Sequence, residues 1–452
     1  MSRRPATLAE AAEWAFCLLG LLLMSEALLG PVFAPDQTVD GPEWLRLVWL
    51  PIYAGLAVLL AWRAPRLGRV WAGGLLALAL VAWAFASQTW SIAPDLSQRR
   101  AIALLFTTLF GLLLAARYGW RGLIELLAAT YLVLAVGSAV AALATPDFGV
   151  HATIHPGAWK GLWYEKNQLG AAMAKGALAC LCAAAVEPRR RWLWVPGAAA
   201  CAGLVLLSTS KTSLLALLLV LGGSGFIAAT RRGGAAAVSG AWLAVVAAGV
   251  AAGVFLLAPE LVFEALGKDP TLTGRTGIWE ALLRRSAERP WEGYGYGAFW
   301  KPELGPAWYV RREVEWEAPT AHNGWLDVLV QLGWIGVALC AAHFALAAGA
   351  ALARWSRPEG GWAVLSLALF ALFSISESTI LQQNNLNWVM YVATAAKLLE
   401  TAPRVRQAAS PRLVEAARAL AWTGARWRRP PPARAPQAGA APGVGWTEPS
   451  AA

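Results

Sequence analysis

Apolar stretches separated by short polar connections make up most of the chain. Many of them are about 17–25 residues long, the length that crosses the ~30 Å hydrocarbon core of a bilayer as a helix. The pattern predicts about twelve membrane-spanning helices, near 12–33, 44–61, 70–87, 101–116, 122–143, 169–186, 192–208, 212–229, 238–257, 323–350, 361–377 and 386–400. Helices of a soluble core are the alternative, but they rarely are so long and so numerous. We therefore expect an all-α integral membrane protein built as a polytopic bundle.

Arginine clusters alternate along the connections. They occupy every second connection, at Arg3/Arg4, Arg63/Arg66/Arg69, Arg117/Arg121, Arg189/Arg190/Arg191, Arg231/Arg232 and Arg354/Arg357. Cytoplasmic loops carry an excess of arginine and lysine, so this alternation predicts that both termini lie in the cytoplasm. The segments near 90–100, 151–168, 208–213, 259–322 and 376–387 then lie on the outer side. The arginine pair before the first apolar stretch, with no small-residue cleavage site after it, is typical of a first span rather than a removed signal peptide.

Two parts of the chain differ in composition. Residues 1–400 form the predicted membrane domain, whose long outer segment is 258–322. In that segment Thr276 can cap a short amphipathic helix, which should end before Pro290. Residues 401–452 are rich in proline, alanine and arginine. They predict a basic cytoplasmic tail that is mostly disordered, with a short interfacial helix at 411–427 against anionic lipid.

The overall composition fits the membrane interpretation. Of the 452 residues, 58% are hydrophobic and 14% are charged, whereas a soluble domain carries roughly 25% charged residues. The net charge of +11 could indicate a nucleic-acid partner. The arginines lie between apolar blocks, however, and not on one helix face, so we expect membrane lipids as their partners and no nucleic acid. The five cysteines lie within apolar blocks and predict neither a metal site nor a disulfide framework.

Charged, aromatic and glycine residues concentrate in one stretch, 273–327, which also contains one of the four histidines. A glycine-aromatic run at 293–297 has some likeness to a nucleotide-binding loop. It lacks the preceding strand that such a loop requires, so we discount that function. The chemistry of the protein is expected in this polar stretch.

His322 begins an apolar span on the predicted outer side. Asn323 and Asp327 follow on the same helix, and Asp327 lies about one turn further on, where it could orient the imidazole. A neutral imidazole can accept a proton from an attacking hydroxyl group, which accelerates such reactions by about 10²–10⁴. The alternative is a histidine that only caps the helix or lies at the lipid interface.

Arg275 and Lys211 are the candidate anion ligands. Arg275 lies beside the start of the expected short helix, and Lys211 lies in a hydroxyl-rich turn, 208–213. Two such cations could stabilise a departing diphosphate, where the loss of one donor costs roughly 3 kcal/mol. Lys211 could instead extend to lipid headgroups. The outer segments show no carboxylate and histidine cluster at Mg²⁺ or Zn²⁺ spacing, so we expect the protein's cations to act without a metal ion or other cofactor.

A third polar group, 163–168, directly precedes a span. Its aromatic residues Trp163 and Tyr164 could line a sugar groove, or its charged residues could lie at headgroup level. Cations at an outer span end need a partner or a function. The cations Lys166 and Arg100 are therefore further candidates for binding a donor or an acceptor substrate. The amides Asn167 and Asn323, which lie next to Lys166 and His322, are candidates as well.

Five runs in this region form a recognisable set. They are Trp90-Ser-Ile-Ala-Pro-Asp95, Glu165-Lys-Asn-Gln-Leu-Gly170, Thr273-Gly-Arg-Thr-Gly-Ile-Trp279, Arg289-Pro-Trp-Glu-Gly-Tyr-Gly-Tyr-Gly-Ala-Phe-Trp300 and Ala321-His-Asn-Gly-Trp-Leu-Asp-Val-Leu-Val-Gln-Leu-Gly-Trp-Ile-Gly336. In this order, over most of 80–395, they resemble the O-antigen ligase/polymerase superfamily. The exopolysaccharide-polymerase-like branch is the most similar.

The resemblance implies a GT-C-like fold and a bacterial inner-membrane glycosyltransferase that is inverting and metal-independent. Such enzymes take a glycan from undecaprenyl diphosphate on the periplasmic face. Ligases transfer it to lipid A-core, and polymerases transfer it to another lipid-linked repeat; both fit these motifs. The family's proposed base or acceptor-orienting histidine corresponds to His322, and its diphosphate-binding residues correspond to Arg275 and Lys211. The family often has arginine where Lys211 stands, and lysine cannot bind two phosphate oxygens in the bidentate way.

A transporter of lipid-linked saccharides is the alternative function. Transporters place charges near the bilayer midplane and often break helices there. The predicted spans carry almost no charge at mid-depth and the polar residues gather on one side, which favours an enzyme. A purely structural scaffold would leave the polar stretch unexplained.

Overall fold

A computed structural model describes residues 7–27, 29–33, 43–153, 155–234, 238–240, 275–301, 305–357 and 359–400. These residues belong to one compact unit, Met1–Thr401. Within them the chain forms α-helices and short 3₁₀ turns, with one isolated β-bridge between Val150 and Trp159. The all-α prediction is therefore confirmed for the described residues, while the tail 401–452 lies outside them.

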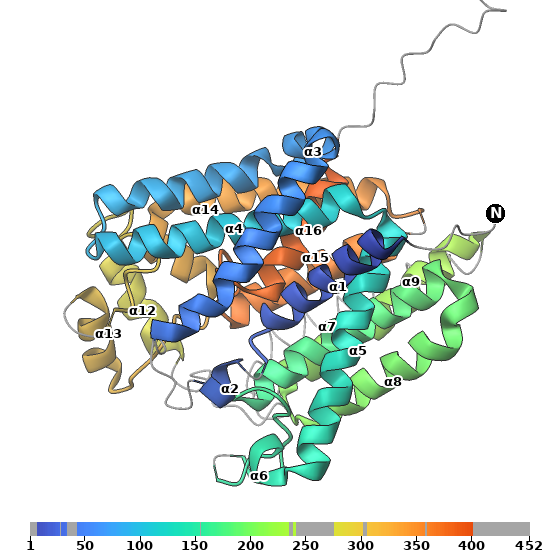
Figure 1. Cartoon of the computed structure of the whole chain (residues 1–452). Coiled ribbons are helices and arrows are strands. Elements are labelled where there is room, and N and C mark those ends of the chain that lie inside the picture. The colour runs from blue at the N-terminus through green and yellow to red at the C-terminus, as the bar shows by residue number, and fades with distance from the viewer. Residues whose placement is uncertain are drawn as a thin grey trace, which may run out of the picture. The chain divides into compact units, whose positions relative to one another are not determined.

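The principal helices follow the apolar stretches of the sequence (Figure 1). Their bounds are α1 Leu8–Leu23, α2 Leu29–Phe33, α3 Trp49–Ala86, α4 Pro94–Arg117, α5 Trp120–Ala144, α6 Pro146–Gly149, α7 Lys166–Val186, α8 Arg191–Leu207, α9 Lys211–Arg232, α12 Arg275–Ser286, α13 Pro306–Val314, α14 Gly324–Ala353, α15 Gly360–Ser376 and α16 Leu386–Leu398. α12 is the expected short helix, and it ends before Pro290 as predicted. It begins at Arg275, however, so Thr276 lies within its first turn and is not the cap.

Six helical stretches in the described residues are long and apolar enough to cross a bilayer, and two shorter apolar helices accompany them. The six are Trp44–Arg63, Pro94–Arg117, Trp120–Ala144, Lys166–Val186, Lys211–Arg232 and Gly324–Ala353. The predicted total of twelve is not confirmed. The expected span 238–257 lies outside the described residues beyond 240. The expected span 386–400 becomes α16, whose 13 residues extend only about 20 Å.

Two other predicted spans, 44–61 and 70–87, are joined differently from the expectation. They belong to a single helix, α3, of 38 residues, which changes direction along its length (Figure 1). Pro65 lies between the two stretches and has no N–H group for the helical ladder, which favours a bend there. The predicted first span, 12–33, is by contrast divided. α1 ends at Leu23, and Glu26 has a φ of 61°, which no continuing helix allows.

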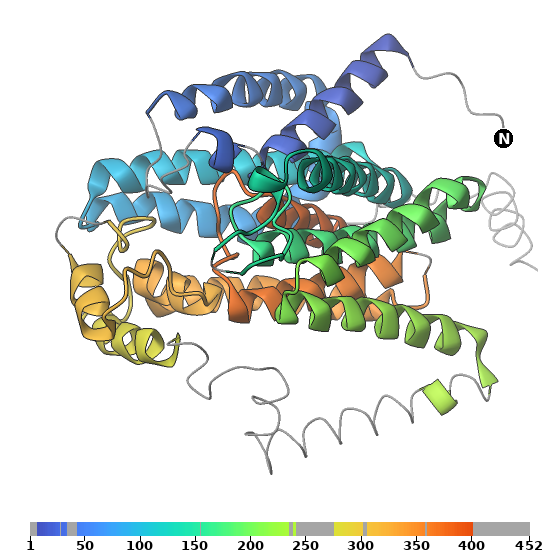
Figure 2. The same cartoon turned by 90° about the horizontal axis from the view of Figure 1, so that it is seen from below.

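α7 is the central helix of the described unit. It packs against α5, α8, α9 and α15 (Figures 1 and 2). Glycine and alanine make up much of its surface, and small residues allow helices in membranes to approach closely. A Cβ atom at Gly170 would lie 2.5 Å from the Ser213 hydroxyl of α9. Along the same helix Lys175 is buried, whereas Asn167 and Gln168 at its N-terminal end are exposed.

α14 is interrupted at Gly333, where φ is 66° and ψ is −170°. Segment 290–295 replaces the lost helical hydrogen bonds. Its N–H groups donate to the carbonyls of Val330 and Gln331 at 2.9 Å, and its Pro290 carbonyl accepts from Trp334 at 2.8 Å. Backbone groups at a break within a membrane helix must find such partners. The glycine-aromatic run is therefore fixed against α14.

Replacing Gly333 with alanine is expected to destabilise the protein by about 2–4 kcal/mol. The left-handed backbone disfavours any Cβ, and this one would lie 2.1 Å from the Trp291 carbonyl oxygen. Gly349→Ala in the same helix is the control, because no atom lies within 4 Å of its Cβ position. Thermal unfolding in detergent measures both. Equal melting temperatures for the two variants would contradict the tight contact between the break and segment 290–295.

Candidate active site

A polar cavity of about 400 Å³ lies where the N-terminal end of α7 meets segments far apart in the sequence. Its wall combines residues from the α1–α2 connection, from α7, from the start of α12, from the segment before α14 and from the α15–α16 connection. The side chains with charged or titratable groups are Glu26, Glu165, Lys175, Arg275, His322 and Glu377. Two predicted catalytic residues, Arg275 and His322, therefore line one cavity.

His322 has an unusual backbone and an unpaired ring. Its φ is 48°, in the left-handed region that non-glycine residues seldom adopt. Neither ring nitrogen has a hydrogen-bond partner among the described residues, and the Trp316 ring stacks on the imidazole at 5.5 Å. Strained residues of this kind cluster at functional sites. The ring is held in place by packing, and both of its nitrogens are buried.

The carboxylate beside His322 differs from the one expected. Nδ1 of His322 lies 3.5 Å from Oε2 of Glu377. Asp327 does not orient the ring as predicted, because its Oδ1 accepts hydrogen bonds from Trp300 Nε1 at 2.6 Å and from the Ala321 N–H group at 3.4 Å. Asp327 instead supports the backbone that precedes His322.

Arg275 reaches the same carboxylate from the start of α12. Its Nη2 lies 3.6 Å from Oε1 of Glu377, and its Nη1 donates to the Ser376 carbonyl at 2.6 Å. The two oxygens of Glu377 thus face one catalytic candidate each. A cation and an imidazole, from segments distant in sequence, are held together by one side chain of the α15–α16 connection.

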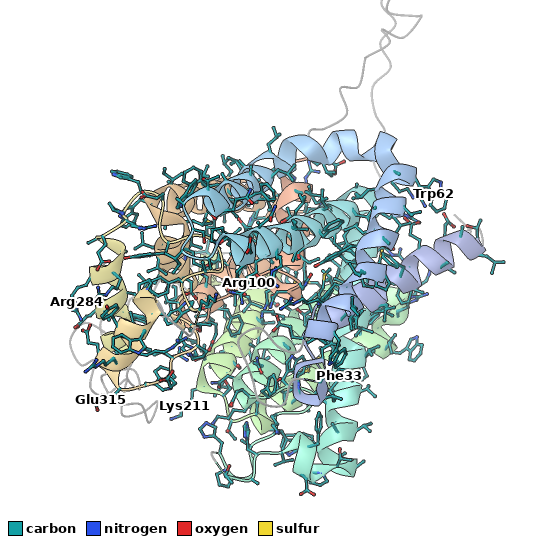
Figure 3. All side chains as sticks on the ribbon, turned by 60° about the vertical axis from the view of Figure 1, so that its left-hand side comes forward. Phe33, Trp62, Arg100, Lys211, Arg284 and Glu315 are labelled. Atoms are coloured by element: carbon teal, nitrogen blue, oxygen red, sulfur yellow. The ribbon has the colours of Figure 1, made fainter. Side chains whose placement is uncertain are left out.

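The predicted binding residues are distributed over three places. Asn167 lines the cavity. Lys166 and Lys211 do not; Lys166 donates to the Thr209 hydroxyl at 3.2 Å beside the N-terminal end of α9, which Lys211 begins. Figure 3 shows Lys211 well apart from Arg100. The proposed partnership of Lys211 with Arg275 in one cavity is thus not seen, because the turn before α9 packs beside α7 and outside the cavity.

Asn323 and Arg100 have partners within the protein. The Asn323 side chain caps α14, accepting from the N–H groups of Trp325 at 3.0 Å and Leu326 at 3.2 Å. Such caps are worth about 1 kcal/mol. Arg100 donates to the Gly297 carbonyl at 2.6 Å and lines a neighbouring pocket instead.

Lys175 is a cavity residue that the sequence analysis missed. It lies within α7, is 5% exposed, donates to Asn387 Oδ1 at 2.5 Å and lies 4.5 Å above the Phe373 ring. The expectation of almost no charge inside the spans is wrong at this position. A single lysine inside an otherwise apolar stretch was the available signal, since intramembrane cations usually serve a function.

The remaining surroundings are polar. Hydroxyl groups of Ser376 and Thr379 have no hydrogen-bond partner among the described residues. Next to the cavity, burial lowers the pKa of His151, whose Nε2 accepts from the Lys166 N–H group at 3.2 Å. This hydrogen bond fixes the start of α7. The described part of the chain contains no group of three histidine, cysteine or acidic side chains placed to hold a metal ion.

The fold and the cavity define a multi-pass α-helical membrane protein with a polar site among its helix ends. A family model described as O-antigen ligase matches residues 196–341, which include Arg275 and His322. The chain is 30% identical over 339 residues to exopolysaccharide production protein ExoQ of Rhizobium meliloti (strain 1021), covering 71% of this chain and 75% of that protein. The chain belongs to the O-antigen ligase/polymerase superfamily, membrane glycosyltransferases of the ligase and polymerase type. The resemblance drawn from its motifs is confirmed.

Proposed function

We propose that this protein transfers a glycan from undecaprenyl diphosphate to a sugar hydroxyl group, with inversion and without a metal ion. The observation that carries the proposal is that Arg275 and His322 meet at the two oxygens of Glu377 in one cavity. A transferase of this kind needs a base for the hydroxyl proton and a cation for the leaving group at adjacent positions. The acceptor is a glycan or lipid A-core.

In the proposed reaction, the acceptor oxygen forms a bond to the anomeric carbon of the donor while the bond from that carbon to the diphosphate oxygen breaks. Attack from the side opposite the leaving group inverts the anomeric centre. A ring nitrogen of His322 takes the hydroxyl proton, and Glu377 stabilises the imidazolium that forms. Undecaprenyl diphosphate leaves with the bonding electron pair. Arg275 and the buried Lys175 are its proposed cationic partners, and Lys211, Lys166 and Asn167 remain proposed contacts further along the donor.

We also propose a position in the bacterial inner membrane, with the cavity on the periplasmic side and both termini in the cytoplasm. The alternation of arginine clusters supports this orientation. Arg63 and Arg117, from two clusters predicted to be cytoplasmic, both pair with the buried Glu13, at 2.5 Å and 2.8 Å. Because both arginines pair with the same carboxylate, the two clusters lie on one side of the bundle.

The test is the lipid-linked material in a strain that lacks this protein. We expect undecaprenyl-linked glycan to accumulate, and polymer or capped glycolipid to be lost, until the gene is restored. A single accumulated repeat identifies a polymerase, and full-length chains left on the carrier identify a ligase. The purified protein in liposomes should form new glycosidic bonds. Translocation of lipid-linked saccharide without such bonds would instead establish the transporter alternative.

A further inference from the structure

A second pocket, of about 250 Å³, lies directly beside the active-site cavity. It is formed by the glycine-aromatic run, by the first turns of α14 and by segment 380–383. Pro319, Thr320 and Gln382 line both spaces. Thr320 lies two residues before His322, and its hydroxyl accepts from the His322 N–H group at 3.4 Å. A ligand in this pocket would therefore end next to the imidazole.

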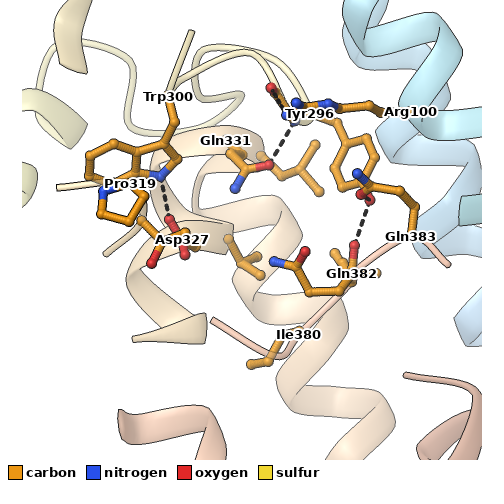
Figure 4. Close-up of a pocket in the computed structure, with 14 residues that line it drawn as sticks. Arg100, Tyr296, Trp300, Pro319, Asp327, Gln331, Ile380, Gln382 and Gln383 are labelled. Atoms are coloured by element: carbon orange, nitrogen blue, oxygen red, sulfur yellow. Dashed lines mark hydrogen bonds between the residues drawn. The ribbon is translucent and has the colours of Figure 1, made fainter. Parts of the chain in front are cut away.

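The pocket wall is rich in carboxamide groups (Figure 4). Gln331 accepts from the Gly297 N–H group through Oε1 at 2.7 Å, which leaves its amide donors for a ligand. Figure 4 shows the amide ends of Gln331 and Gln382 directed into the same space. Gln383 completes this set, and its Oε1 lies 3.0 Å from the Tyr296 hydroxyl. Such groups both donate to and accept from hydroxyl groups.

Aromatic rings form the rest of the polar wall. Trp300 is 6% exposed, and its Nε1 donates to Asp327 Oδ1 at 2.6 Å. Tyr296 donates to the Leu381 carbonyl at 2.5 Å. Both rings are thus fixed by hydrogen bonds at their polar ends, and each lines the pocket with the small part of its surface that is exposed. Fixed aromatic surfaces beside carboxamides suit a sugar ring, which has apolar faces and a rim of hydroxyl groups.

The pocket is poorly suited to a diphosphate. Arg100 is the one cationic side chain in its described wall, and its Nη1 donates to the Gly297 carbonyl at 2.6 Å. The main cavity has Arg275 and Lys175 instead. The volume is also below the ~300–1,000 Å³ of pockets for drug-sized ligands. One sugar ring, rather than a longer chain or a charged headgroup, matches this size and chemistry.

We propose that this second pocket binds the terminal sugar ring of the acceptor, whose hydroxyl group then reaches His322 past Thr320. The donor diphosphate occupies the main cavity on the other side of the shared wall. Binding of a sugar ring stands on the pocket alone, whereas its role as acceptor rests on the proposed function. The two spaces provide separate positions for the two substrates of one transfer reaction.

Saturation-transfer NMR on the full-length protein in detergent, with a panel of methyl hexopyranosides as probes, tests the proposal. Gln383→Leu is the informative variant, because Gln383 lines only the second pocket and Tyr296 keeps its bond to Leu381. Asn167→Leu removes a carboxamide from the main cavity as the matched control. We expect at least one probe to bind the wild type, and Gln383→Leu to weaken that binding by about fivefold to tenfold. Asn167→Leu should leave it unchanged.

Three results would overturn the assignment: no probe binding to the wild type, equal binding to Gln383→Leu, or a loss that follows Asn167→Leu instead. Melting temperatures show whether Gln383→Leu is folded. If it is not, Gln331→Met, at another carboxamide of the same pocket, takes its place in the comparison. Because probe binding requires no turnover, it is independent of transferase activity. Probe binding as expected, with no glycosidic bond formed in liposomes, would refute the proposed function and leave the sugar pocket standing.

Discussion

Replacing His322 with asparagine is expected to lower the rate of glycan transfer by a factor of about 10²–10⁴, the usual contribution of a general base. Asparagine tolerates the left-handed backbone of this position, where φ is 48°, better than most residues do. It therefore removes the imidazole without adding strain. His322→Ala removes the same group in a residue less suited to this backbone. Equal loss of activity in both variants would assign the effect to the imidazole.

The measurement is the rate of polymer or glycolipid formation by purified protein in liposomes that contain the lipid-linked donor. His155→Ala is the matched control. His155 is exposed, its ring lies 5.7 Å from that of His151, and it is not part of the cavity wall. It should retain the wild-type rate. A stable, inserted His322→Asn protein that transfers glycan at the wild-type rate would exclude His322 as the base.

The helices of the unit could be predicted because bilayer crossing is a local property of sequence. A run of apolar residues must form a helix to satisfy its backbone in lipid, and α4, α5, α7 and α9 follow the predicted spans closely. The interruption of α14 could not be found in this way. Gly333 was one of many glycines in the chain, and the groups that stabilise its unusual backbone come from segment 290–295, in a separate part of the sequence.

Residues of the candidate site could be selected from the sequence only where one motif contained the chemistry. Arg275 and His322 were selected because each is a costly polar group in a distinctive short run. Glu377 was missed, although its segment, 376–387, was recognised as polar and outer. Its place in the candidate site comes from two contacts with residues at 275 and 322, which no local pattern records. Lys211 shows the converse limit, because its motif resembles the family but its side chain lies outside the cavity wall, so that its role stays a proposal.

The close packing of α7 connects the fold to the chemistry. Gly170 and its small neighbours allow α9 to approach, and the N-terminal half of the helix carries Asn167 and Lys175 into the cavity wall. Glu377 lies at the end of α15, which packs on α7 as well. Both the buried cation and the bridging carboxylate are thus positioned by the same central helix. The candidate site is built from residues of the packed unit.

Replacing Arg275 with alanine is expected to lower the transfer rate by about 10², because the loss of one preorganised donor to a developing anion costs roughly 3 kcal/mol. Arg275 has a side chain 21% exposed, so the diphosphate can reach the guanidinium. Arg275→Lys should restore only part of the rate. Lysine keeps the charge but cannot present two parallel donors, or bond to Glu377 and a phosphate in the same fixed geometry.

Arg284→Ala provides the matched control for Arg275, since it removes the same charge from the same helix. Arg284 is 56% exposed and pairs with Glu313 outside the cavity wall. Exposed pairs of this kind contribute about 0–1 kcal/mol to stability, so both folding and transfer should survive. Equal losses in the two variants would mean that α12 contributes general positive charge to the site. A loss confined to Arg275 would locate the leaving group at the cation beside Glu377, opposite the imidazole that takes the proton.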